Sequence, residues 1–358
     1  MKKTLCILLC MTVMLVFAAC GGDKEENSSA VDYTYEIAFL TPFTEISIDD
    51  EDRMEAAWNG VRQFAEENGK TYKYYEAEAN NTKAQLSRIQ DAVEAGAKVI
   101  VAVGPEVEEA IAEAQNKFKD VKFIYLDGTL DKTADNCVIV RFEPLQAGFL
   151  AGYGAVIEGL GNLGYLADGE NAESIAYGYG FLQGANEAAM RFGRYAVIRY
   201  HYGDKDNTKE DIGKIAETWY DDGMRAIFTY GGHVFKAVKA EAEKADRIVI
   251  GSNASKEYSK TVITSARKCY EAVVAEQLKK AYEKSFEGGK TIYMNAKNGG
   301  IGLDMKHSKF QYFNQTLYDD IYKELAKGEM EVFSAKDAKT VDELVKAKWL
   351  YYIRIDQE

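Results

Sequence analysis

Proline, histidine and cysteine are scarce in this sequence, and each scarcity argues against a class of structure or chemistry. Its 358 residues include three prolines, three histidines and five cysteines. A metal site built on several histidines is therefore not expected. Among the histidines, only His233, beside a glycine pair at the end of a predicted strand, is placed where it could touch a ligand. Cys137 and Cys269 lie in apolar or helical stretches, which predicts buried free thiols in place of a disulfide framework.

Familiar catalytic motifs are also missing. The sequence contains no G-x-S-x-G elbow, no H-E-x-x-H pair and no C-x-x-C pair. Residues 289–291 resemble the end of a phosphate-binding loop, but Lys284 stands where the first glycine of that motif should be. The acidic run 49–52 could bind a cation, or could be a solvated loop or the charged start of a helix. Binding of a small polar molecule is favoured over catalysis, and no cofactor is expected.

Positive charge is in deficit, since the formal net charge is -13 and no cluster of lysine and arginine offsets it. A nucleic acid partner would require a basic face that releases counterions, so no nucleic acid partner is expected. The hydrophobic content of 47% suffices for substantial cores, and the length favours two domains over one.

Residues 1–19 have the three parts of a secretory signal: lysines, an apolar run too short to span a membrane comfortably, and small residues. Cys20 resembles the acylated cysteine of the bacterial lipobox, although Phe17 stands where leucine is more usual. An ordinary cleaved signal with an incidental cysteine is the alternative. Residues 20–33 are rich in glycine, serine and charge, which is typical of a flexible tether. The folded part is therefore expected outside the cytoplasmic membrane, held there by a lipid anchor.

From Tyr35 onward, short apolar runs alternate with amphipathic segments of helical length, and the same alternation begins again after Ala155. This pattern predicts an α/β fold with two doubly wound parallel sheets. Ligands of such sheets bind at the carboxyl ends of the strands. The loops at those ends are rich in Asp, Asn, Ser and Gly, which can bind a ligand but can also simply form turns and helix caps.

The stretch 137–155 joins the two halves. An apolar strand is expected to end before Pro144, which suits the first turn of a helix. Gly148 and Gly152 would then lie on one face of that helix, where the absent side chains allow another backbone to come close.

Several pieces of sequence, in a fixed order between about Tyr35 and Phe333, resemble one known family. They include AAWNGVRQFAEENG, VIVAVGPEVEEAIAEA, VKFIYLDG, RFEPLQAGFLAGYGA, GYGFLQGANEA, IVIGSN and VITSARK. The sequence is similar to the basic membrane lipoproteins, the purine nucleoside receptor type of substrate-binding lipoprotein that serves ABC transporters.

The resemblance implies a type I periplasmic-binding-protein fold, in which the chain crosses three times between two lobes that close over a ligand. The first lobe would comprise residues 34–142 plus about 263–298, and the second 143–262 plus about 299–333. Residues 334–358 look like an appended C-terminal tail. The first crossover and part of the hinge would lie at 141–144.

The resemblance also assigns ligand-binding residues. Asp127 matches a base-contacting aspartate and Lys268 a ribose-contacting lysine. Asp50 resembles an acidic position in the first loop, and Gly231 a glycine that approaches the ligand closely. Tyr177 stands where the family usually has a phenylalanine that stacks on the purine, so it keeps the aromatic face and adds a hydroxyl.

Two departures bear on specificity. Arg53 and Met54 replace an aromatic-asparagine pair, and a guanidinium could either stack on a base or select an anionic group. Asn253 replaces a ribose-binding aspartate, which keeps an acceptor but loses the charge that strengthens a bond to a diol.

The function expected from this resemblance is that of a monomeric, membrane-anchored receptor that delivers a nucleoside-like solute to an ABC permease. The sequence leaves open a sensing protein that signals to a membrane partner, and a receptor for a non-nucleoside solute, including an anionic one. An extracellular nucleoside hydrolase would rest only on the acidic run 49–52.

Overall fold

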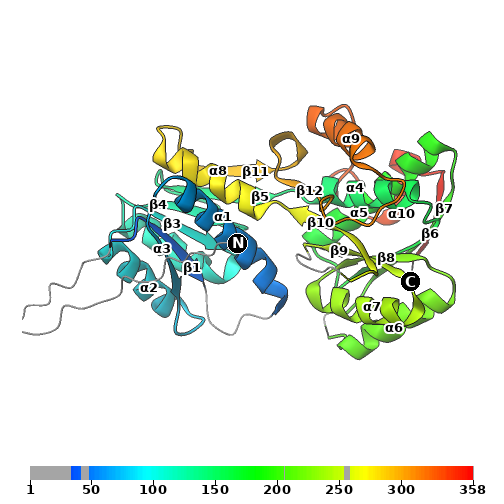
Figure 1. Ribbon diagram of the computed structural model, residues 1–358, viewed down its shortest axis with the longest axis horizontal. Helices are drawn as coiled ribbons and strands as arrows, with labels where there is room; N and C mark the ends of the chain where they lie inside the picture. The colour runs from blue at the N-terminus through cyan, green and yellow to red at the C-terminus, as the bar shows by residue number, and fades with distance from the viewer. Residues whose placement is uncertain (1–33, 42–47, 205, 254–258, 358) are drawn as a thin grey trace, which may run out of the picture. The chain divides into compact units, whose positions relative to one another are not determined.

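The structure is a computed structural model that describes residues 34–41, 48–204, 206–253 and 259–357. Strands and helices alternate along it and form two separate sheets, each flanked by helices (Figure 1). The α/β class predicted from the hydrophobic pattern is therefore confirmed.

The first lobe, as named here, is the six-stranded sheet with its helices. Its strands are β1 (Ile37–Thr41), β2 (Tyr72–Glu76), β3 (Val99–Val103), β4 (Lys122–Leu126), β5 (Cys137–Phe142) and β11 (Lys290–Met294). They lie in the order β11-β5-β4-β3-β1-β2, with every neighbouring pair parallel. Its helices are α1 (Ile48–Glu67), α2 (Thr82–Glu94), α3 (Glu108–Lys117) and α8 (Tyr270–Tyr282), with a 3-10 turn at Pro105–Val107.

The second lobe is the seven-stranded sheet with its helices. Its strands are β6 (Asn162–Ala167), β7 (Ala196–Tyr202), β8 (Ala226–Tyr230), β9 (Ile248–Ser252), β10 (Val262–Lys268), β12 (Ile301–Leu303) and β13 (Ile353–Gln357). Their order is β12-β10-β9-β8-β6-β7-β13, and only β12 runs antiparallel to its neighbour. Its helices are α4 (Leu145–Ile157), α5 (Ala172–Phe192), α6 (Lys209–Asp221), α7 (Gly232–Ala245), α9 (Gln315–Lys327) and α10 (Val341–Lys348), and a 3-10 turn at Ala296–Asn298 precedes β12.

The two sheets repeat one topology. In each, the first strand lies between the second and the third, so β2-β1-β3-β4-β5 corresponds to β7-β6-β8-β9-β10. The chain passes between the sheets after β5, after β10 and after β11. These three passages are the crossovers of the type I periplasmic-binding-protein fold, which the family resemblance implied.

Strand pairing corrects two expected boundaries. Residues 263–268, expected in the first lobe, belong to β10 and pair with β9 and β12 of the second sheet. The expected tail 334–358 is not a mere appendage, since β13 pairs in parallel with β7 over five residues and Leu344 of α10 is fully buried.

The helices cover both faces of each sheet and enclose three buried clusters. The helices α2 and α3 cover one face of the first sheet, α6 and α7 one face of the second. The remaining faces, covered by α1 and α8 and by α4 and α5, share one continuous core, to which the Phe142 and Tyr270 rings contribute with centroids 4.7 Å apart. Along the described residues, none of the helices has the length and apolar character needed to cross a membrane.

Candidate functional site

Four of the residues predicted to bind a ligand contact one another at the carboxyl ends of strands. Lys268, the last residue of β10 in the second sheet, places Nζ 3.2 Å from Oδ1 of Asp127, which follows β4 in the first sheet. The backbone N–H of Lys268 donates to Oδ1 of Asn253 at 2.8 Å, and the Tyr177 hydroxyl reaches the same oxygen at 3.5 Å. Residues far apart in sequence and from both lobes thus form one site.

Asp127 and Asn253 share an unusual backbone. Their φ angles are 56° and 51°, in the left-handed region that non-glycine residues seldom adopt. Asp and Asn tolerate this region better than most residues, because a short polar side chain can hydrogen-bond locally. Each backbone N–H donates to the next strand, Asp127 to Val140 and Asn253 to Ala266. The two lobes therefore use the same turn to direct a polar side chain at corresponding strand ends.

Lys268 is a buried cation whose charge is met by carboxylates. Only 4% of its side chain is exposed, and Nζ lies 2.6 Å from Oε1 of Glu173 in addition to its contact with Asp127. Burial alone would lower the pKa of Lys268, but the neighbouring Tyr270, Asp127 and Glu173 outweigh burial and raise it well above its usual value. Lys268 is therefore positively charged throughout the neutral range.

Three side chains of this site were not predicted. Glu173 lies in the first turn of α5, and its Oε2 accepts a hydrogen bond of 3.1 Å from the Tyr230 hydroxyl. The Tyr270 hydroxyl donates to Oδ2 of Asp127, and burial, followed by the Asp127 charge, raises the pKa of Tyr270 well above normal. Each lies within a few residues of a predicted position or in a loop rich in polar residues, but proximity in sequence could not single it out.

Gly231 and the guanidinium of Arg53, a residue of α1, lie beside the ends of other strands. Gly231 follows β8 with φ 100°, and a side chain there would collide with Asp168, since an added Cβ would lie 2.6 Å from Oδ2. This position therefore requires glycine. The Arg53 guanidinium forms an ion pair of 3.0 Å with Glu106 beside Gly104, which follows β3.

The remaining predicted positions are less informative. The backbone of Asp50 is in the first turn of α1, but its side chain, like the rest of the acidic run, and Cys20 lie outside what the structure describes. His233 is partly exposed in the first turn of α7. Cys137 and Cys269 are both free; Cys137 is buried, as expected, and burial raises its pKa to about 11, whereas Cys269 is only partly buried. In the described ranges, no group of three or more His, Cys, Asp or Glu could hold a metal ion.

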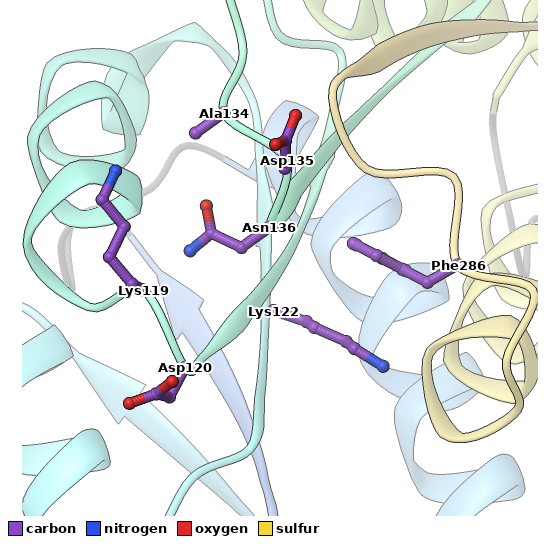
Figure 2. A pocket seen from close by; sticks show the side chains of 7 residues that line it. All are labelled: Lys119, Asp120, Lys122, Ala134, Asp135, Asn136 and Phe286. Carbon is purple, nitrogen blue, oxygen red and sulfur yellow. The ribbon is translucent and has the colours of Figure 1, made fainter.

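A separate pocket of about 470 Å³ opens elsewhere in the first lobe (Figure 2). Its lining residues lie at or shortly before the starts of β4, β5 and β11: Lys119, Asp120, Lys122, Ala134, Asp135, Asn136 and Phe286. Apart from Lys122, which begins β4, they therefore come from turns at the amino ends of these strands, at the opposite edge of the sheet from Asp127. In Figure 2 the Lys122 side chain extends toward the Phe286 ring, with Nζ 5.3 Å from its centroid. This pocket is distinct from the site of predicted residues.

Comparison with known proteins identifies related sequences and folds. The family described as "ABC transporter substrate-binding protein PnrA-like" matches residues 39–338. The ABC transporter nucleoside-binding protein BmpA of Lactococcus lactis is 23% identical over 84% of this chain and 90% of the relative. Basic membrane protein A of Borreliella burgdorferi is 24% identical over 93% and 96%. Among solved structures, an ABC transporter solute-binding protein from Conexibacter woesei aligns with a TM-score of 0.71 at 18% identity, covering 84% of this chain and 99% of that one.

Proposed function

Since the chain belongs to the PnrA-like family of ABC transporter substrate-binding proteins, we propose that it captures a nucleoside-like polar solute between its two lobes and delivers it to a membrane permease. The observation that carries this proposal is the contact of Lys268 from the second sheet with Asp127 from the first. A ligand that bonds to both side chains would join the lobes, and hinge closure would then bury it. The relative from Lactococcus lactis, named a nucleoside-binding protein, supports the choice of ligand class.

The available groups suit such a solute. Asp127 and Asn253 offer side-chain oxygens that can accept from base or ribose, and Lys268 supplies a charged donor. The Tyr177 ring is fully buried against the partly exposed ring of Tyr230, with centroids 5.5 Å apart, so this pair offers a base aromatic surface at Tyr230. Arg53 could cover the other face of the base from the first lobe.

Thermal unfolding of the purified full chain tests the ligand class. A ligand present at 100 times its dissociation constant should add about 2.7 kcal/mol of stability. Adenosine, guanosine, inosine and pyrimidine nucleosides are the first compounds to test. If none of them shifts the unfolding curve at millimolar concentration, the nucleoside assignment is wrong, and native mass spectrometry of the purified protein would then identify a retained ligand.

Variants test the site. Asp127→Ala and Lys268→Ala should each weaken ligand binding by about 1.5–3 kcal/mol, the range for hydrogen bonds to charged groups. Lys119→Ala, at the separate pocket, removes a charge of the first lobe without touching the site and should leave affinity unchanged. Near wild-type affinity in both site variants would overturn the assignment.

We further propose that the protein is a monomer held outside the cytoplasmic membrane by a lipid on Cys20, and that it binds without catalysis. Metabolic labelling with a fatty acid should mark the wild-type chain and not Cys20→Ser, which should also leave the membrane fraction. Light scattering should give the mass of one chain. Incubation with inosine and calcium should release no free base; release would instead support a hydrolase.

A further inference from the structure

Glu173, a residue of the second lobe, forms an ion pair with Lys268, as Asp127 of the first lobe does. Its Oε1 lies 2.6 Å from Lys268 Nζ, and its Oε2 accepts from the Tyr230 hydroxyl at 3.1 Å. The Glu173 side chain is 38% exposed, compared with 13% for Asp127 and 4% for Lys268. Within this trio, Glu173 is the member that an incoming solute meets most readily.

The trio carries more negative than positive charge. Two carboxylates face one ammonium group, so Asp127, Glu173 and Lys268 together have a formal charge of −1. Two arginines near other strand ends are engaged with partners of their own. Arg53 forms an ion pair with Glu106 at 3.0 Å, and Arg141 donates to the carbonyl oxygens of Gly128 and Leu130.

This balance determines which ligand groups fit. The carboxylate oxygens have acceptor capacity beyond the bonds they make here, so a ligand satisfies them with hydroxyl or amino donors. A phosphate or carboxylate would have to displace Glu173 from Lys268 and would still face two negative groups at short range.

We propose that Glu173 is a specificity-determining residue that neutralises Lys268 and thereby makes the site select neutral or cationic solutes over anionic ones. This inference rests on the proposed binding function and specifies the ligand class. It also argues against an anionic solute, which the guanidinium of Arg53 had left open as an alternative. Removing the Glu173 charge should free Lys268 to bind an anion.

The test compares Glu173→Gln with the wild-type full chain and with Glu170→Gln. Glu170 is exposed in the loop that precedes α5, so its replacement makes the same change of charge two residues before the helix. The probes are adenosine, adenosine monophosphate and an analogue of adenosine in which an amine replaces the terminal ribose hydroxyl. Calorimetry gives the three dissociation constants.

Wild type and Glu170→Gln should bind adenosine and its amine analogue at least about tenfold more tightly than the monophosphate. In Glu173→Gln, this preference should shrink by about tenfold or reverse. A preference that is unchanged in Glu173→Gln, or a wild-type protein that prefers the monophosphate, would overturn the proposal. Glu173→Ala, measured with the same three probes, shows whether a change in Glu173→Gln comes from the lost charge or from a local misfolding of that variant.

A second measurement separates this inference from the nucleoside assignment. Millimolar inorganic phosphate should raise the unfolding temperature of Glu173→Gln relative to chloride of equal ionic strength, and should not raise that of wild type or Glu170→Gln. If no adenosine compound binds but phosphate stabilises only Glu173→Gln, the nucleoside assignment fails and the charge selection stands. Equal responses to phosphate in all three proteins would contradict the charge selection.

Discussion

The two lobes repeat one topology but differ in how closely their corresponding helices pack. In the first lobe α1 lies beside α8, and in the second α5 lies beside α4 (Figure 1). One glycine, Gly60, brings α1 against α8, since a Cβ there would lie 2.4 Å from the Glu271 carbonyl oxygen. Between α4 and α5 four glycines serve this purpose, with added Cβ atoms 1.9–2.2 Å from facing carbonyl oxygens: Gly148, Gly152, Gly180 and Gly184.

This difference bears on the binding site. The carbonyl that faces Gly148 belongs to Tyr177, so the glycine contact fixes the backbone that presents the aromatic ring. Close-packed backbones have little room to shift, because interiors are as dense as organic crystals. The second lobe therefore holds its aromatic residue on a rigid helix pair. The sequence predicted this packing for Gly148 and Gly152, and the structure confirms it.

The substitution with the largest expected effect disrupts the contact between α4 and α5. Gly180→Ala would place Cβ 1.9 Å from the Leu145 carbonyl oxygen, and should destabilise the protein by about 3 kcal/mol or more. Gly60→Ala should cost less, about 1–3 kcal/mol, because its added Cβ would lie farther, at 2.4 Å, from the facing carbonyl oxygen of Glu271. Gly213→Ala in α6, where the nearest atom would be 3.5 Å away, is the control and should stabilise by up to about 1 kcal/mol. Urea unfolding measures all three, and a Gly180 variant as stable as the Gly213 variant would refute the packing argument.

The lobes also differ at the matching positions Asp127 and Asn253. Both follow corresponding strands with left-handed backbones, but Asp127 accepts from the side chains of Lys268 and Tyr270. Asn253 accepts from the Lys268 backbone N–H and, at 3.5 Å, from the Tyr177 hydroxyl. The first lobe thus supplies a charge, and the second supplies a neutral acceptor.

Exchanging these side chains tests the difference. Asp127→Asn removes a charge-assisted bond to Lys268 and should weaken ligand binding by about 1.5–3 kcal/mol. Asn253→Asp keeps the acceptor and adds charge, so it should tighten the binding of any ligand with a ribose diol. Calorimetry with any nucleoside found to bind the wild-type protein gives both effects. Unchanged affinity in Asn253→Asp would mean that the ligand has no diol at this position.

The sequence predicts the fold better than it predicts the site. Alternating apolar runs and helices indicate parallel sheets, because burial on both faces demands continuous apolar strands. Strand partners are less predictable: β10 was expected in the first lobe, and pairing with β9 places it in the second. The sequence did not predict Glu173 as a site residue, because the helix dipole explains a glutamate in a first helical turn as well as ligand binding does. Its contact with Lys268, 95 residues away, depends on the fold.

The smallest effects are expected from replacing one surface carboxylate in each lobe. The hydrogen bond from Lys98, with a further bond from Lys70, lowers the pKa of Glu36 below its usual 4.5. In the second lobe, Arg191 of α5 binds Glu324 of α9 through two N–H groups, at 2.9 and 2.6 Å, and lowers the pKa of that carboxyl. A lowered pKa means stability that is present above the unfolded value, near 4.5, and is lost as the pH falls through the folded value.

Glu324→Gln should therefore destabilise the protein at pH 7 by about 0.5–1 kcal/mol, and Glu36→Gln by less, because a two-pronged arginine pair is stronger than exposed lysine pairs. The penalty of each variant should shrink as the pH falls below 4.5 and disappear once the wild-type carboxyl is also protonated. Urea unfolding at pH 7 and at low pH gives both differences. A Glu324 penalty that persists in acid would show that Arg191 orders the α5 and α9 helices by packing, and that charge contributes little to their contact.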